Sequence, residues 1–299
     1  MRKIEVGENL YEVTPHGDYG FPFYAEMIFL SEYEHSSFAV HWHPEVEFLL
    51  VLEGDMEYRA NQTVYHLSEG NGIFVNANCL HTANSCEGRD CRYFAFTFNP
   101  VLIYGHDNST IEKKYVEPVV TSSDFSSFPL DPGREEHREM LRIFREIYSV
   151  YSKPGECYEL GMKSLLCQLW ACVYREFRQN SIGKERSEGK NLELLRQMLN
   201  YMHENYTAAI SLEDIAASCH VSKSKCCHFF KETMRLTPFE YLMRYRIQKS
   251  LPLLLEGSRS ITEISERIGF SGSSYFSEIF RRYMNCAPSE YRRKHAQGN

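Results

Sequence analysis

The chain has 299 residues, and its content of 43% hydrophobic and 14% aromatic residues excludes an intrinsically disordered protein. A net charge of −7 at neutral pH would by itself argue against a nucleic-acid partner. The charge is uneven, however, because residues 189–299 carry 16 Lys and Arg against 11 Asp and Glu. The length therefore predicts two well-packed domains, an acidic one followed by a basic one.

The cysteines favour a reducing environment. All ten are scattered, and the sequence has neither a Cys-x-x-Cys pair nor an N-terminal signal peptide. No apolar run approaches the length of a membrane span, so no membrane partner is expected. The sequence thus predicts a cytoplasmic protein with reduced thiols.

Residues 1–105 contain short alternating or apolar runs separated by Gly and Asn turns. Residues 47–52, 56–59 and 92–98 are examples. This pattern predicts an antiparallel β-barrel or sandwich.

A polar motif interrupts these apolar runs. His41 and His43 are separated by one residue, so on a strand their side chains point the same way, and Glu47 can reach the same cavity. Together with Gly54 and the later His81, the motif resembles the metal signature of the cupins. The resemblance implies that His41, His43, Glu47 and His81 line one cavity inside the barrel.

Three roles for these four residues stay open. In cupin enzymes such a set holds iron, manganese, zinc or nickel for oxygenase or isomerase chemistry. We favour a metal-free pocket for a small-molecule effector, which requires no cofactor, over a divalent metal site and over simple lining of the barrel. Asn76 and Asn78 replace the Pro and Gly that usually shape the turn before the last cupin histidine, which weighs against a metal.

Helical spacing follows the barrel. Residues 134–152 and 158–178 each carry an apolar stripe that needs a partner surface. The stripes are expected either to pack on the barrel or to form a two-helix dimer interface. The polar run that follows, residues 179–190, is typical of a flexible linker.

The remaining residues contain one helix-turn-helix pattern written twice. Leu212, Ile215 and Ala216 share one helical face in the first copy, and the second copy opens at Ile261 with Gly269 at its turn. The offset is 49 residues from Ile215 to Ile264 and from Val221 to Phe270, and 50 from Pro238 to Pro288 and from Tyr241 to Tyr291. Helical solenoids usually need three or more copies, so two copies favour a pair of DNA-reading units.

This region resembles the AraC/XylS family of bacterial transcription regulators over roughly residues 191–293. The resemblance rests on residues 237–242 (Thr-Pro-Phe-Glu-Tyr-Leu) with Arg246, on residues 264–280, and on residues 288–292 (Pro-Ser-Glu-Tyr-Arg). It implies a regulator that binds double-stranded DNA and a small-molecule effector, with carbohydrates as family-level candidates. It also implies a homodimer, and contact with RNA polymerase if the protein is an activator.

The second helix of each unit is expected in the major groove, with its N-terminal part facing the bases. Family positions assign base contacts to Ser224, Cys227, His228, Ser273, Ser274 and Ser277. They assign phosphate contacts to Lys223, Lys225, Lys231 and Arg281. Small hydroxyls reach few base atoms, so much of the specificity is expected from His228, DNA shape and bridging water.

The sequence thus predicts an α+β multidomain protein. The expected parts are a cupin-like sensor barrel (1–105), a helical dimerisation region (106–180), a linker (181–190) and an all-α tandem helix-turn-helix domain (191–299). The expected function is that of a bacterial, cytoplasmic, effector-controlled transcription regulator, an activator rather than a repressor, and not an enzyme. The competing hypothesis is a metal-dependent cupin oxygenase or isomerase with an appended DNA-binding domain.

Overall fold

The computed structural model describes residues 1–299 except 8–9, 87–88, 123, 181–184, 235 and 296–299. The chain divides into two compact units, Met1–Glu185 and Arg186–Asn299. Among the described residues, no helix is both long and apolar enough to cross a membrane.

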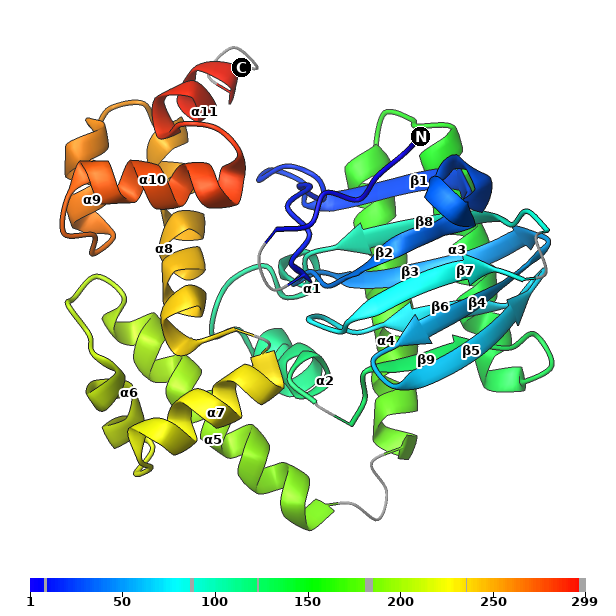
Figure 1. The fold of residues 1–299 in the computed structure, drawn as a ribbon, viewed down its shortest axis with the longest axis horizontal. Coiled ribbons are helices and arrows are strands. Elements are labelled where there is room, and N and C mark those ends of the chain that lie inside the picture. The colour runs from blue at the N-terminus through cyan, green and yellow to red at the C-terminus, as the bar shows by residue number, and fades with distance from the viewer. Residues whose placement is uncertain (8–9, 87–88, 123, 181–184, 235, 296–299) are drawn as a thin grey trace. The chain divides into compact units, whose positions relative to one another are not determined.

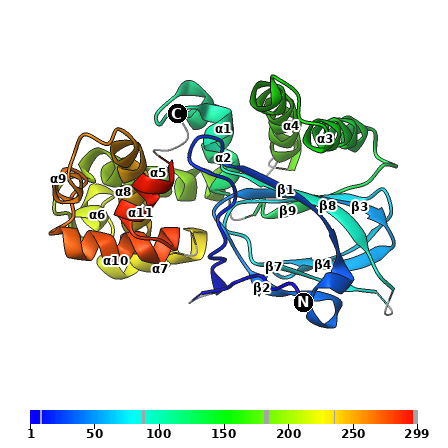
Figure 2. The same cartoon turned by 90° about the horizontal axis from the view of Figure 1, so that it is seen from above.

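The first unit is built from two antiparallel sheets that face one another (Figure 2). A five-stranded sheet has the order β1-β8-β3-β6-β9, and a four-stranded sheet has the order β2-β7-β4-β5. The strands are β1 (Phe23–Phe29), β2 (Ser37–His41), β3 (Val46–Glu53), β4 (Asp55–Ala60), β5 (Thr63–Ser68), β6 (Gly72–Val75), β7 (His81–Ser85), β8 (Arg92–Phe98) and β9 (Ser127–Leu130). The predicted fold class, a cupin-like antiparallel β domain followed by helices, is confirmed.

Strand β3 shows why a strand of the larger sheet has a continuous apolar sequence. Successive side chains point to opposite faces of a strand. Leu49 and Val51 enter the core between the two sheets, whereas Phe48 and Leu50 join the core on the outer face. Both faces are therefore buried, and Glu47 shares the parity of the side chains that point inward.

Two long helices cover the outer face of the five-stranded sheet (Figures 1 and 2). They are α3 (Glu135–Ser152) and α4 (Tyr158–Asn180), and they follow the short helices α1 (Val101–Tyr104) and α2 (Glu117–Val120). The ring of Phe144 on α3 lies 4.8 Å from that of Phe96 and 6.4 Å from that of Phe48, between centroids. The predicted apolar stripes therefore pack on the barrel, which is the first of the two expected arrangements.

Two expected boundaries need correction. The β domain does not end at residue 105, because β9 pairs with β6 from Ser127 to Leu130 and completes the larger sheet. The expected linker 181–190 is helical from residue 185, where α5 (Glu185–Asn205) begins. Its Glu, Arg and Lys residues are good helix formers, so the polar composition that resembled a linker is also compatible with a helix. Residues 181–184 lie outside the described residues.

The second unit contains two helix-turn-helix units joined by a long helix. The first is α6 (Leu212–Ser218) with α7 (Lys223–Met234), and the second is α9 (Ile261–Arg267) with α10 (Ser273–Met284). The connecting helix is α8 (Pro238–Leu255), and α11 (Pro288–His295) closes the unit. Helices α6 and α9 start 49 residues apart and α7 and α10 start 50 apart, so the extra residue of the second copy lies in its turn.

Local sequence fixes where these helices begin. Ser211 and Ser260, at equivalent places before α6 and α9, each accept a hydrogen bond from the backbone N–H three residues later. Asp214 and Glu263 in turn accept a hydrogen bond from the backbone N–H of the capping serine. Such reciprocal capping satisfies backbone donors that a helix start otherwise leaves without partners.

Each helix-turn-helix unit has its own apolar core, and α8 contributes to both. The second helices, α7 and α10, each bury an apolar face in these cores. Its buried members are Cys226, Phe230, Phe276, Ile279 and Phe280, and Phe229 is half-buried. Arg246 of α8 is also buried and donates from Nε to Tyr206 O (2.8 Å) and from Nη2 to Ala208 O (2.7 Å). It thereby ties α8 to the segment between α5 and α6.

Each of the two turns contains a residue with positive φ, but the residue types differ. Gly269 has φ +84°, and a Cβ there would lie 2.4 Å from Tyr206 O. His220, 49 residues earlier, also has positive φ, at 55°. A side chain in this left-handed region costs about 1–2 kcal/mol, which the first copy tolerates because His220 is exposed.

We predict that Gly269→Ala lowers the free energy of unfolding of the second unit by at least about 2 kcal/mol, because it adds a backbone clash to the strain. The matched variant His220→Gly should change it by less than about 0.5 kcal/mol, since relief of strain and gain of chain entropy offset each other. Denaturant unfolding of the full chain measures both. Equal effects of the two variants would contradict the close approach at Gly269.

Candidate effector site and DNA interface

The four polar residues predicted inside the barrel lie together between the two sheets. His41 and His43 are 3% exposed, Glu47 8% and His81 1%. His41 ends β2, His81 begins β7 directly opposite it, and Glu47 is on β3 of the other sheet. The ring centroid of His81 lies 4.1 Å from that of His41 and 5.0 Å from that of His43.

Backbone carbonyl groups orient all three imidazoles. The contacts run from Nδ1 of His41 to Ala39 O (2.8 Å), of His43 to Glu45 O (3.2 Å) and of His81 to Cys79 O (3.0 Å). A carbonyl oxygen only accepts, so each Nδ1 must donate. In a neutral ring the lone pair is then on Nε2, which in each of the three histidines faces a carboxylate of the cavity.

Glu47 is the carboxylate that the imidazoles of His43 and His81 face. Its Oε1 accepts a hydrogen bond from the Tyr58 hydroxyl (2.9 Å), and its Oε2 lies 3.3 Å from Nε2 of His43 and 3.5 Å from Nε2 of His81. Burial alone would raise the pKa of Glu47, but the facing imidazoles outweigh it and hold that pKa well below its usual range. Conversely, burial opposes a charge on His81, and Glu47 nevertheless raises the pKa of His81.

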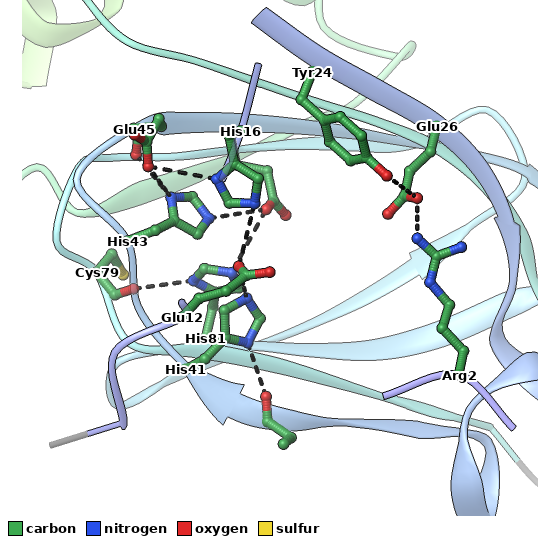
Figure 3. Close-up of polar contacts among 12 residues, drawn as sticks. Arg2, Glu12, His16, Tyr24, Glu26, His41, His43, Glu45, Cys79 and His81 are labelled. Atoms are coloured by element: carbon green, nitrogen blue, oxygen red, sulfur yellow. Dashed lines mark hydrogen bonds and ion pairs between the residues drawn. The ribbon is translucent and has the colours of Figure 1, made fainter. Parts of the chain in front are cut away.

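Sequence reasoning missed a second half of this cluster, which comes from the N-terminal segment, defined here as residues 10–16. His16 of this segment is buried between two carboxylates, with Nε2 3.3 Å from Glu12 Oε2 and Nδ1 3.4 Å from Glu45 Oε2 (Figure 3). Although burial opposes its charge, these carboxylates raise the pKa of His16 to about 10. Glu12 Oε2 also lies 3.4 Å from Nε2 of His41, which joins the two halves.

The backbone holds the N-terminal segment against the barrel beside β2. Glu12 N donates to Trp42 O, and Trp42 N donates to Leu10 O, both at 3.0 Å. The rings of Tyr11 and Trp42 lie 5.1 Å apart. The segment precedes the first strand and has no periodic pattern. The only sequence signal was therefore the acid–histidine pair, four residues apart, within it.

A cavity of about 100 Å³ adjoins the cluster. Its polar lining includes Arg2, Glu12, His16, Tyr24, Glu26 and His41. Glu26 accepts from the Tyr24 hydroxyl (2.7 Å) and pairs with Arg2 (Figure 3). Sites for drug-sized ligands are typically about 300–1,000 Å³, so this cavity admits only a small ligand.

The residues predicted to contact DNA lie on α7 and α10. Seven of the ten are exposed: Lys223, Ser224, Lys225, His228, Lys231, Ser274 and Arg281. The other three are half-buried: Cys227, Ser273 and Ser277. Nε2 of His228 lies 3.2 Å from Oε1 of Glu232, and Lys223 pairs with Glu213. The assignment of individual contacts stays a prediction.

Comparison with known proteins agrees with this two-part architecture. A family model described as an AraC-like ligand binding domain matches residues 25–170, and one described as a helix-turn-helix domain matches residues 215–294. The chain is 30% identical over 294 residues to an uncharacterized HTH-type transcriptional regulator, YdeC, of Bacillus subtilis, covering 98% of this chain and 99% of that one. It is 24% identical to the melibiose operon regulatory protein of Escherichia coli, covering 85% and 83%.

Among solved structures, ToxT from Vibrio cholerae matches with a TM-score of 0.45 and 15% identity, covering 90% of this chain and 97% of that one. The fold and the sequence relatives define a DNA-binding transcription regulator with a ligand-binding domain. The chain belongs to the AraC/XylS family. Its relatives are named as transcriptional regulators, so it is not an enzyme, and the competing cupin-enzyme hypothesis is set aside.

We predict that His16→Gln loosens the N-terminal segment, because it removes the cation between Glu12 and Glu45. Losing about 1.5 kcal/mol of charge-assisted hydrogen bonding raises the open population about tenfold. Chymotryptic cleavage after Tyr11 should accelerate accordingly when measured on the folded chain. His35→Gln, at a side chain that is 88% exposed, is the control. Equal cleavage of wild type and His16→Gln would show that the contact does not hold the segment.

Proposed function

We propose that this protein is a bacterial, cytoplasmic activator that binds its DNA sites in response to a small carbohydrate held in the barrel. The observation that carries the proposal is a small cavity, lined in part by charged and polar side chains, in the same chain as two helix-turn-helix units. Effector binding alters the equilibrium among arrangements of the DNA-binding unit by its differential affinity for them. As an activator, the DNA-bound protein contacts RNA polymerase.

The lining of the cavity favours a polyhydroxylated ligand. Glu12, His41 and Glu47 line the cavity. His43 and His81 contact Glu47, so donors and acceptors gather beside one small volume. Hydroxyl groups donate and accept at once and therefore suit such a surface. One relative is named for an operon of a sugar, melibiose. The cavity volume of about 100 Å³ favours a ligand no larger than a monosaccharide.

The two recognition helices, α7 and α10, are proposed to read two major-groove segments about one helical turn apart. Small and polar residues face the bases, and His228 is the largest side chain among the proposed base contacts. Lys225, Lys231 and Arg281 are proposed to contact phosphates beside them.

A homodimer is proposed through the outward face of α4. Leu160, Ser164, Cys167 and Ala171 are all exposed, and their spacing of four, three and four residues forms one continuous seam. Leu160 is 71% exposed, which is unusual for a large apolar side chain on a helix whose opposite face is buried. Because the seam is small and self-complementary, a second copy of α4 is its proposed occupant.

The test of the function is selection of genomic fragments on the purified full chain, with and without a panel of monosaccharides. We expect a few enriched sites, each with two short boxes about one turn apart, and at least one sugar that changes DNA affinity about tenfold. Sequence-independent recovery, or affinity and oligomeric state unchanged by every sugar, would contradict the proposal.

Two variants sharpen the same measurement. Lys225→Ala should weaken all sites alike and reduce the slope of log affinity against log salt by about 0.9. His228→Ala should instead relax specificity at one base pair by about 1–3 kcal/mol. Lys163→Ala, at an exposed lysine of α4, should change neither quantity.

We predict that Leu160→Glu weakens the dimer about 100-fold, because two buried Leu side chains are lost and two like charges face each other. Analytical ultracentrifugation measures the dissociation constant. Ile111→Glu places the same charge at another exposed apolar residue of this unit and is the control. Oxidative cross-linking through Cys167 should decline in parallel. A dimer as tight in Leu160→Glu as in wild type would exclude this face.

A further inference from the structure

The polar cluster in the barrel has the properties of a cation site. One ligand atom each from His41, His43 and His81 lies within 4.8 Å of the others. All three rings are fixed by backbone carbonyl groups at Nδ1, so their Nε2 lone pairs are available. Histidines that bind metals are oriented in this way by a partner at the other ring nitrogen.

One of these nitrogens has no adequate partner. Nε2 of His81 is buried, and within the described part of the chain it makes no hydrogen bond. It lies 3.5 Å from Glu47 Oε2. Buried polar atoms are otherwise nearly always paired, so this atom points to a group that belongs in the cluster.

The charges of the cluster call for a cation. Three carboxylates, those of Glu12, Glu45 and Glu47, converge on the four imidazoles. Buried charges are stable only when they are paired or coordinate a metal. His16, between Glu12 and Glu45, offsets one negative charge. A divalent cation among three neutral imidazoles would offset the other two.

We propose that His41, His43, His81 and Glu47 bind one divalent transition-metal ion, and that Glu12 of the N-terminal segment joins them as a ligand. Imidazole and carboxylate together suit zinc, manganese, iron, cobalt or nickel. Because Glu12 belongs to a segment outside the sheets, the ion fixes the N-terminal segment to the barrel. The inference rests on the proposed function, since it makes the ion part of the effector site.

The segment is linked to the ion through two contacts of one carboxylate. Glu12 Oε2 lies 3.4 Å from His41 Nε2 and 3.3 Å from His16 Nε2. His16 contacts carboxylates through both nitrogens and is therefore a positioning residue for Glu12 rather than a ligand. Because Glu12 is a metal ligand from the N-terminal segment, this site differs from one made by barrel strands alone. Binding of the ion would therefore hold the segment in place.

The test is titration of the chelator-stripped full chain with Co(II), followed by its visible ligand-field absorption. We expect one Co(II) per chain, competed by Zn(II). His81→Ala should lose at least about 100-fold in affinity and Glu12→Gln at least about tenfold, the latter with a changed spectrum. Controls are His66→Ala and Glu5→Gln, at exposed residues. His43→Gln, closer in volume, replaces His81→Ala if circular dichroism shows that it is unfolded.

Protection of the N-terminal segment gives an independent readout. Co(II) should slow chymotryptic cleavage after Tyr11 in wild type but not in Glu12→Gln. Absence of stoichiometric binding, or equal affinity in wild type and both histidine variants, would overturn the site. Equal affinity and equal protection in Glu12→Gln would remove the segment from it. Sugar-dependent DNA binding is measured separately, so it can fail while Co(II) binds, or persist when Co(II) does not.

Discussion

The alternation of side chains along β3 is the constraint on which the first unit depends. Because the strand is covered on both faces, Phe48 and Leu50 anchor the helices α3 and α4 while Leu49 and Val51 fill the interior between the sheets. The same parity places Glu47 inside. If the pairing of β3 shifted by one residue, the carboxylate of Glu47 would point toward the helices. Phe48 and Leu50 would then point between the sheets.

An ionic cluster inside an apolar sandwich is costly, and the structure reduces the cost by giving each carboxylate polar neighbours. Glu47 has Tyr58 and two histidines, whereas Glu12 and Glu45 share His16. Removing one partner from such a network leaves an uncompensated buried charge. The N-terminal segment therefore contributes two side chains, Glu12 and His16, to the polar cluster, and a ligand of this site would contact them.

In the DNA-binding unit, the two copies of the helix-turn-helix motif differ in the residue at the turn. Both copies begin their first helix with the same reciprocal serine cap, and both need a left-handed residue at the turn. Gly269 meets the backbone of Tyr206 and cannot carry a side chain, whereas His220 has room for one. The shared helix α8 and its Arg246 connect the two cores.

The sequence by itself determined the elements whose signals are local or periodic: the strand segments at residues 47–52, 56–59 and 92–98, the helices α3 and α4, and the repeated helices. The grouping of His81 with His41, His43 and Glu47 came from the resemblance to the cupin signature. Only the tertiary structure decided which residues outside the periodic segments pack or pair with these elements. Strand β9, the helical start at Glu185 and the cluster half made by Glu12, His16 and Glu45 depend on contacts between distant positions. Neither periodicity nor turn chemistry records such contacts, because burial and charge pairing fix them only when the chain is folded.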